Sequence, residues 1–107
     1  MDTTTLTPAR CKLGIFVTLD AKPGKADEVA DFLRGALPLV EAETGTTGWY
    51  ALQLTDSQFA IFDTFANDHD RDAHLSGQVA AALMEKAPDL FDRTPLIHKV
   101  EILAAKL

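Results

Sequence analysis

The hydrophobic positions of this chain recur every second residue in some stretches and every third or fourth residue in others. Residues 13–21, LGIFVTLDA, alternate between apolar and other side chains, which predicts a β-strand. One face of this strand carries Leu13, Ile15, Val17 and Leu19. Phe16 lies on the opposite face, so we expect both sides of the strand to contact protein.

A helical spacing follows the turn AKPGK at residues 21–25. From Lys25 onward the apolar residues recur every three or four positions, which predicts an amphipathic helix. Pro38 lies inside this pattern, and we expect it to bend the helix rather than end it, because the pattern continues through Val40. The segment ETGTTG at 43–48 is expected to stop the helix. The apolar stripe consists of Ala26, Val29, Ala30, Leu33, Ala36, Leu37 and Val40.

The second half of the chain shows the same two spacings again. Two β-type runs, WYALQLT at 49–55 and FAIFDTFA at 59–66, are joined across Asp56–Ser57, which predicts a tight hairpin. A second helical region is predicted from residue 67 to about residue 87, with a break near Gly77.

The last predicted strand is LIHKVEILAA at 96–105, after a loop expected between Pro88 and Pro95. The order β-α-β-β-α-β predicts an α+β, ferredoxin-like fold, in which both helices cover one face of a four-stranded antiparallel sheet. We expect residues 1–11 to form a flexible arm and residues 12–107 to form a single domain.

The other face of the predicted sheet has no helix to cover it. Phe59, Ile61 and Phe65, or the residues that alternate with them, would lie bare on that face. Contiguous apolar patches of this size are rare on monomers. We therefore expect a homodimer in which two sheets pack face to face.

Composition and charge narrow the classes of function. Of 107 residues, 47 % are hydrophobic and 24 % are charged, which is typical of a soluble globular protein. The net charge of −6 and the lack of a Lys/Arg cluster argue against nucleic acid and anionic membranes as partners. Neither a membrane-length apolar run nor a secretory signal is apparent, so we expect a cytoplasmic protein. The single cysteine, Cys11, excludes an internal disulfide.

The most polar stretch is NDHDRDAH at residues 67–74. Asn67 has the properties of a helix N-cap, and Asp70 follows at the capping-box position. His69 and His74 are five residues apart and do not share a helix face, and no Cys/His cluster elsewhere supplies further ligands. The stretch therefore predicts a capped helix start, and we expect no metal site.

Two residues are not explained by capping. His74 borders the apolar stripe of its helix, where it is either a structural side chain or an acid, base or hydrogen-bond donor near neutral pH. Asp63 shares a strand face with aromatic and aliphatic residues, where a carboxyl group has a raised pKa unless it is paired. The alternative for Asp63 is an edge position exposed to solvent or bonded to the hairpin partner.

The hairpin turn decides which aromatic residue lies across from Asp63. An even turn places Tyr50 opposite Asp63 and Trp49 opposite Thr64, whereas an odd turn exchanges them. In either register, an aromatic side chain with a polar group borders Asp63.

Two segments, FVTLDAKPGKADEVADFLRGALPLVEAETGT and FAIFDTFANDHDRDAHLSG, resemble the antibiotic biosynthesis monooxygenase-like family of dimeric α+β barrels. The resemblance covers about residues 12 to 104. Its markers are KPGK after the first strand, E-x-G at the end of the first helix, and an acid-x-aromatic pattern followed by AH-x-S. In this chain the last two patterns are formed by Asp63, Phe65, Ala73, His74 and Ser76.

The resemblance implies a ferredoxin-like subunit with an apolar cavity, in a dimer that joins two sheets into a barrel. Relatives include cofactor-free oxygenases of anthrones and quinols, haem-degrading enzymes, and an isomerase of a small signalling sugar. Cofactor-free oxygenation needs a base, hydrogen bonds to an oxyanion and the exclusion of water. Haem is disfavoured, because the haem-degrading branch uses an asparagine on the first strand and a tryptophan at the end of the third. The first strand of this chain has no asparagine, and its third strand ends in Phe65.

The leading hypothesis is a homodimeric, cofactor-independent monooxygenase that acts on a small aromatic or quinol-like substrate. His74 and Asp63 are the candidate catalytic residues. The pocket walls are expected to come from Trp49, Tyr50, Ile61 and Phe65. The alternative is a non-enzymatic ligand-binding or stress-associated barrel, favoured by a closed cavity and an Asp63 that is hydrogen-bonded to the backbone.

Overall fold

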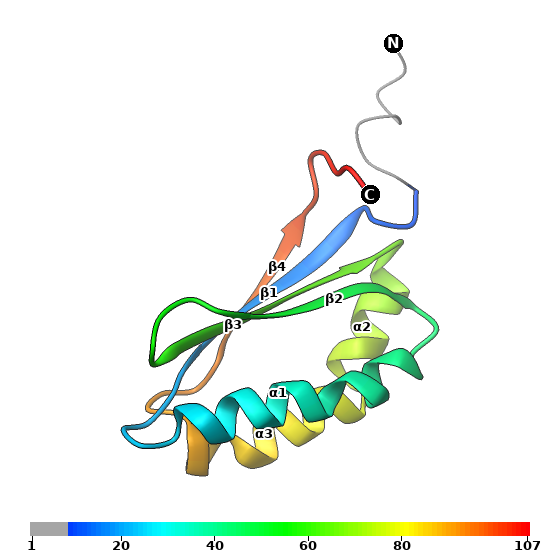
Figure 1. The fold of residues 1–107 in the computed structure, drawn as a ribbon. Helices are drawn as coiled ribbons and strands as arrows, with labels where there is room; N and C mark the ends of the chain where they lie inside the picture. Colours follow the sequence, from blue (N-terminus) through cyan, green and yellow to red (C-terminus); the bar gives the residue numbers. More distant parts are fainter. Residues whose placement is uncertain (1–8) are drawn as a thin grey trace.

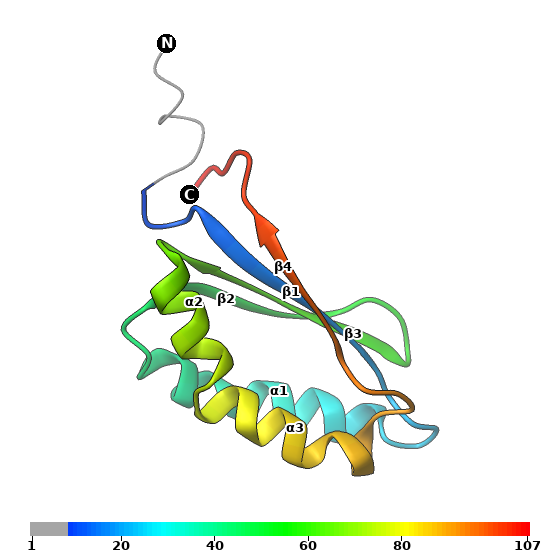
Figure 2. The same cartoon turned by 180° about the vertical axis from the view of Figure 1, so that it is seen from behind.

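One antiparallel sheet with helices on one face makes up residues 9–107, the part of the chain that the computed structural model describes (Figures 1 and 2). Its elements are β1 (Leu13–Asp20), α1 (Ala26–Glu41), β2 (Thr46–Gln53), β3 (Gln58–Phe65), α2 (Asp68–Leu75), α3 (Gln78–Leu90) and β4 (Leu96–Glu101). The strand order is β2-β3-β1-β4, and each neighbouring pair is antiparallel. This confirms the predicted α+β, ferredoxin-like fold, with the second helical region divided near Gly77 as expected.

The two prolines within the helical patterns both lie inside helices. α1 continues through Pro38, and the N–H of Ala42 donates to the carbonyl oxygen of Pro38 at 3.3 Å. Pro88 lies inside α3, so the loop predicted to begin there is wrong. The apolar stripe of α3 continues through buried Ala87 and Leu90, and this packing outweighs the one backbone hydrogen bond that a proline removes.

The core lies between the sheet and the helices. Phe59, Ile61 and Phe65 are at most 4 % exposed there, so the alternative that placed these three side chains on the bare face is wrong. The helices present apolar stripes, and the strand face with most large apolar residues is buried against them. The core also includes Ile15, Val17, Leu19, Val29, Leu33, Leu83, Leu90 and Phe91.

The opposite sheet face, which we call the open face, carries the alternate residues of the strands. Phe62 and Tyr50 stack there with ring centroids 6.4 Å apart. Tyr50 is 50 % exposed, Leu52 40 % and Leu96 55 %. No helix of the described residues covers this face, as both views of the fold show (Figures 1 and 2).

The N-terminal arm was predicted for residues 1–11. Residues 1–8 of it lie outside the described part of the chain. In the part that is described, Cys11 is only 4 % exposed. The N–H of Lys12 donates to the carbonyl oxygen of Phe65 at 3.0 Å, which attaches the segment to the end of β3. Among residues 9–107, every helix is too short or too polar to cross a membrane.

Candidate functional site

The helix α2 is held at both its start and its side. The side chain of Asn67 accepts a hydrogen bond from the N–H of Asp70 at 2.9 Å, which confirms the predicted N-cap. Arg71, which is 9 % exposed, donates to the carbonyl oxygens of Gly14 at 3.4 Å and Val100 at 3.2 Å. These contacts attach α2 to β1 and β4 and determine where the next turn of the helix lies.

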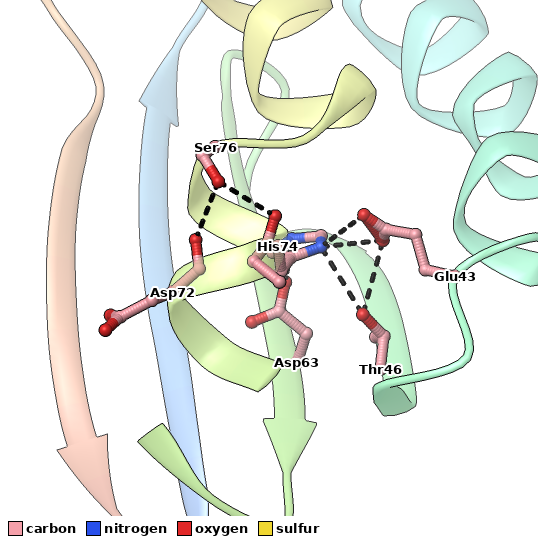
Figure 3. Close-up of polar contacts among 7 residues, drawn as sticks. Glu43, Thr46, Asp63, Asp72, His74 and Ser76 are labelled. Atoms are coloured by element: carbon pink, nitrogen blue, oxygen red, sulfur yellow. Dashed lines mark hydrogen bonds and ion pairs between the residues drawn. The ribbon is translucent and has the colours of Figure 1, made fainter. Parts of the chain in front are cut away.

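His74 lies in the last turn of α2 with its ring between two carboxylates (Figure 3). Its Nε2 atom is 2.9 Å from Oδ2 of Asp63. Its Nδ1 atom is 2.7 Å from Oε2 and 3.0 Å from Oε1 of Glu43. The imidazole is 7 % exposed, so both contacts are largely shielded from water. We call Glu43, Asp63 and His74 the buried triad.

Asp63 comes from β3, one of the two central strands, and lies on the face of the sheet that the helices cover. It is 1 % exposed, so the alternative of a solvent-exposed edge position is wrong. Its second oxygen, Oδ1, has no hydrogen-bond partner of normal geometry among the described residues. Asp63 is therefore a buried carboxyl group with one oxygen in contact with His74, and a hydrogen bond from the backbone of Ile15 also acts to lower its pKa.

Glu43 lies just after α1, and Thr46 begins β2. The hydroxyl group of Thr46 donates to Oε2 of Glu43 at 3.2 Å, and its oxygen lies 3.4 Å from Nδ1 of His74. The side chain of Glu43 is 21 % exposed, against 2 % for Asp63. Of the two carboxylates that contact the imidazole, Glu43 is thus the one that retains some solvation.

Burial and charge change the proton affinities within the buried triad. Burial raises the pKa of Asp63 above 3.8, the contact with His74 lowers it, and the charge of Glu43 raises it further. Burial lowers the pKa of His74, but the hydrogen bonds and charges of Asp63 and Glu43 outweigh this effect. The net pKa of His74 is therefore raised above 6.5.

The geometry indicates that each ring nitrogen of His74 takes part in a hydrogen bond that contains one proton. Nδ1 is surrounded by oxygen atoms of Glu43 and Thr46 that act as acceptors, so the hydrogen-bond network assigns a proton to Nδ1. Nε2 and Oδ2 of Asp63 share the second proton, because two unprotonated atoms at 2.9 Å would repel each other. This second proton is on a donor–acceptor pair whose members both have raised pKa values.

Three of the predicted pocket residues lie on the same side of the sheet as His74. Trp49 pairs with Asp63 across β2 and β3, and its Nε1 atom has no hydrogen-bond partner among the described residues. The ring of Phe65 is 5.3 Å from that of His74 between centroids. Ile61 is 4 % exposed and belongs to the core.

Tyr50 does not lie beside Asp63. It pairs with Phe62 on the open face, so the alternative that placed Tyr50 opposite Asp63 is wrong. The ladder has an irregularity between Thr46 and Gly48, and its register puts Trp49 rather than Tyr50 on the side of the helices.

Sequence analysis missed Glu43 as a member of the site. The only signal was the E-x-G marker of the family resemblance, in which Glu43 appeared as the end of a helix. Gly45 and Gly77 explain the close approach. A Cβ at Gly45 would lie 2.8 Å from the Asp70 side chain, and one at Gly77 would lie 3.1 Å from Oε1 of Glu43.

A hollow of about 280 Å³ lies at the joint between α2 and α3. It is mostly apolar, and Gly77, which lies against Glu43, is part of its wall. The lining residues are Leu75, Ser76, Gly77, Ala80, Ala81, Leu83, Met84 and Ile97. Among residues 9–107, His, Cys, Asp and Glu side chains do not gather in threes with the geometry of a metal site.

The chain is similar to the NE2512 protein of unknown function from Nitrosomonas europaea, whose crystal structure has 55 % sequence identity and a TM-score of 0.89. That match covers 92 % of this chain and 96 % of the other. No protein-family model matches the chain, and neither does any curated protein.

More distant structures have the same fold. The PA3566 protein from Pseudomonas aeruginosa has 18 % identity and a TM-score of 0.74, over 85 % of this chain and 93 % of the other. An antibiotic biosynthesis monooxygenase has 12 % identity and a TM-score of 0.72, over 82 % and 95 %. At these identities the likeness establishes a shared fold.

Proposed function

Since the chain belongs to the same family as the NE2512 protein and has the antibiotic biosynthesis monooxygenase-like fold, we propose that it is an acid–base enzyme of the cofactor-independent monooxygenase type. Its substrate would be a small aromatic or quinol-like molecule. The observation that carries this proposal is the contact between His74 and Asp63, because it joins a buried imidazole to a buried carboxyl group whose second oxygen is not in contact with the imidazole.

The first step is removal of a proton from the substrate. A phenolic hydroxyl or an activated C–H donates its proton to Oδ1 of Asp63, while the proton at Oδ2 passes to Nε2 of His74. The resulting imidazolium is stabilised by the charge of Glu43. One proton enters the buried triad and one negative charge appears on the substrate, so the net charge of the complex does not change.

The second step is transfer of electrons from the substrate anion to O₂. For a methylene group between aromatic rings, the anion R₂CH⁻ forms a C–O bond with O₂ to give the peroxide anion R₂CHOO⁻, and the buried triad returns its proton to this peroxide. Loss of H₂O then breaks the O–O bond and the remaining C–H bond and leaves R₂C=O, so that overall R₂CH₂ and O₂ give R₂C=O and H₂O. One oxygen atom enters the product, and the substrate supplies all four electrons. The protein contributes a dry, apolar environment in which the anion is not quenched by water.

We place the substrate beside Asp63, with Trp49, Phe65 and Ile61 as walls and the hollow at the joint between α2 and α3 as the way in. The Nε1–H of Trp49 and Oδ1 of Asp63 form a donor and an acceptor on adjacent strands, which suits a hydroxyl group. Because Asp63 and His74 are buried, α2 has to move to admit a substrate.

We also propose that the enzyme is a homodimer. The open face carries Tyr50, Leu52 and Leu96 with 40 to 55 % of their surface exposed, and a second sheet packed against it would bury them. Tyr50 would then lie in the dimer interface rather than in the wall of the pocket.

A second candidate function is a non-enzymatic barrel in which the buried triad only stabilises the fold. The 1 % exposure of Asp63 and the 7 % exposure of His74 favour it, because no substrate reaches these atoms without a movement of α2. The two candidates predict different outcomes when substrate is offered.

Oxygen consumption decides between them. We would offer anthrone, 1,8-dihydroxyanthrone and 1,4-dihydroxynaphthalene, subtract autoxidation without protein, and compare the parent with Asp63→Asn and His74→Gln. We expect protein-dependent uptake that falls about 100-fold or more in both variants. The control is Asp72→Asn on the exposed side of α2, whose carboxylate only faces Lys99 at 3.6 Å.

Retention of parent turnover by folded Asp63→Asn and His74→Gln proteins would remove both residues from the mechanism. Uptake at the autoxidation rate with all three compounds would favour the non-enzymatic barrel.

A further inference from the structure

We propose that Glu43 is a positioning residue, which orients the imidazole of His74 so that Nε2, and not Nδ1, exchanges its proton with Asp63. This inference rests on the proposed function for its effect on turnover, but its structural part can be measured without a substrate.

The contacts of Glu43 are those of a group that fixes a tautomer. Both of its oxygens lie within 3.0 Å of Nδ1 of His74, and Thr46 donates a further hydrogen bond to Oε2. A carboxylate that already accepts from Thr46 acts as an acceptor toward Nδ1. The proton on Nδ1 is therefore held, and Nε2 is left as the titrating atom.

The two carboxylates of the buried triad are not equivalent. The side chain of Glu43 is 21 % exposed and retains part of its hydration, whereas that of Asp63 is 2 % exposed. Removing water disfavours a charge, so the negative charge is more stable on Glu43 than on Asp63. The mobile proton consequently belongs to the pair formed by Asp63 and Nε2, and Glu43 stabilises the imidazolium when the proton moves to His74.

The backbone around Glu43 is built for this approach. Gly45 lies against Asp70 of α2, where a Cβ would be 2.8 Å from its side chain. Gly77 lies against Glu43, where a Cβ would be 3.1 Å from Oε1. Both glycines permit the segment after α1 to pack closely on α2 and on the turn that follows α2. The short distance from Glu43 to Nδ1 of His74 therefore depends on glycine at these two positions.

The test uses protein labelled with ¹⁵N in the histidine rings, of which the chain has 3. His74→Gln assigns the signals of His74, and spectra from pH 5 to pH 9 give its tautomer and its titration midpoint. The variants are Glu43→Gln, which keeps the shape without the charge, and Glu43→Ala. The matched control is Glu41→Gln, an exposed glutamate that ends α1 two positions before Glu43.

We expect the parent and Glu41→Gln to show His74 protonated at Nδ1 with its titration above pH 6.5. In Glu43→Gln the midpoint falls, because a neutral amide stabilises the imidazolium less than a carboxylate does. In Glu43→Ala the two tautomers mix. In turnover, kcat falls by about tenfold or more in Glu43→Gln with KM nearly unchanged, since Glu43 does not touch the substrate.

An unchanged tautomer and titration midpoint of His74 in folded Glu43→Gln would overturn the proposal. If Glu43→Ala does not fold, Glu43→Gln still decides, because it retains the volume and hydrogen-bonding capacity of the side chain. If the ring signals shift as expected but the parent consumes no oxygen, the proposed function fails while the positioning role of Glu43 stands.

Discussion

The two faces of the sheet are opposite in character. Beneath the helices, charged groups such as Asp63 and His74 are almost completely buried among aromatic and aliphatic side chains. On the open face, large apolar side chains such as Tyr50 and Leu52 are 40 to 50 % exposed. A group in the wrong environment costs free energy unless something compensates for it. The first face compensates with paired hydrogen bonds, whereas the second leaves its apolar side chains exposed to water in the single chain.

In the proposed function, this difference assigns proton transfer to one face of the sheet and dimerisation to the other. Buried ionisable groups acquire altered pKa values, which suits proton transfer. Exposed apolar side chains are stabilised when a second surface covers them, which suits an interface between two copies of the chain. The predictions below test whether the two faces are as distinct as the structure indicates.

The largest effect on unfolding free energy is expected when one phenylalanine on each face is replaced by alanine. Phe59, 2 % exposed beneath the helices, should lose about 3–5 kcal/mol of unfolding free energy when replaced by alanine, because a cavity is left in the core. Phe62→Ala, three residues further along β3 and on the open face, should lose clearly less unfolding free energy in dilute protein. Urea unfolding monitored by circular dichroism measures both, and equal losses would contradict the distinction between the faces.

A smaller effect is expected on association. Leu52→Lys on the open face should weaken the homodimer by about tenfold or more, because a charge would be buried in the interface. Leu37→Lys on α1 is the control, because Leu37, which its spacing assigned to the apolar stripe, is in fact 45 % exposed, close to the 40 % of Leu52. Analytical ultracentrifugation measures the dissociation constants. A parent protein that stays monomeric at micromolar concentration would show that the open face is not covered in this way.

The smallest and most specific effect concerns pH. The pKa values of Asp63 and His74 are both raised in the folded protein, so the folded state binds protons more tightly than the unfolded chain. The contribution of His74 to stability is fully present below the unfolded pKa near 6.5, and is lost as the pH rises through the folded pKa. That of Asp63 is lost from pH 3.8 upward in the same way.

The melting temperature should therefore fall as the pH rises above 6.5, with a slope in unfolding free energy of at most about 1.4 kcal/mol per pH unit for each proton. His74→Gln should remove the His74 part of this slope, whereas His98→Gln on the open face should leave it. A slope that persists in folded His74→Gln would assign the effect to other groups.

The alternation of residues along the chain was enough to predict the sheet, the helices and their order. Period-two alternation in the first strand and period-three-to-four spacing in the first helix are local signals, and both elements lie where they were expected. Asp63 and His74 were also identifiable locally, because Asp63 interrupts an apolar strand pattern and His74 borders the apolar stripe of its helix. Asn67 was recognisable as an N-cap from its residue type and the acidic residues after it.

The contacts among these residues were decided only by the tertiary structure. Glu43 and His74 are 31 positions apart. The contact of the Glu43 carboxylate with the imidazole depends on the close approach of the segments at Gly45 and Gly77. Whether Trp49 or Tyr50 faces the helices depends on the register of β2 against β3. This register includes an irregularity between Thr46 and Gly48 that the residue pattern does not predict. Periodicity determines which side chains share a face, but only the packing of helices on the sheet determines which face is buried, and with it which ionisable groups lose their water.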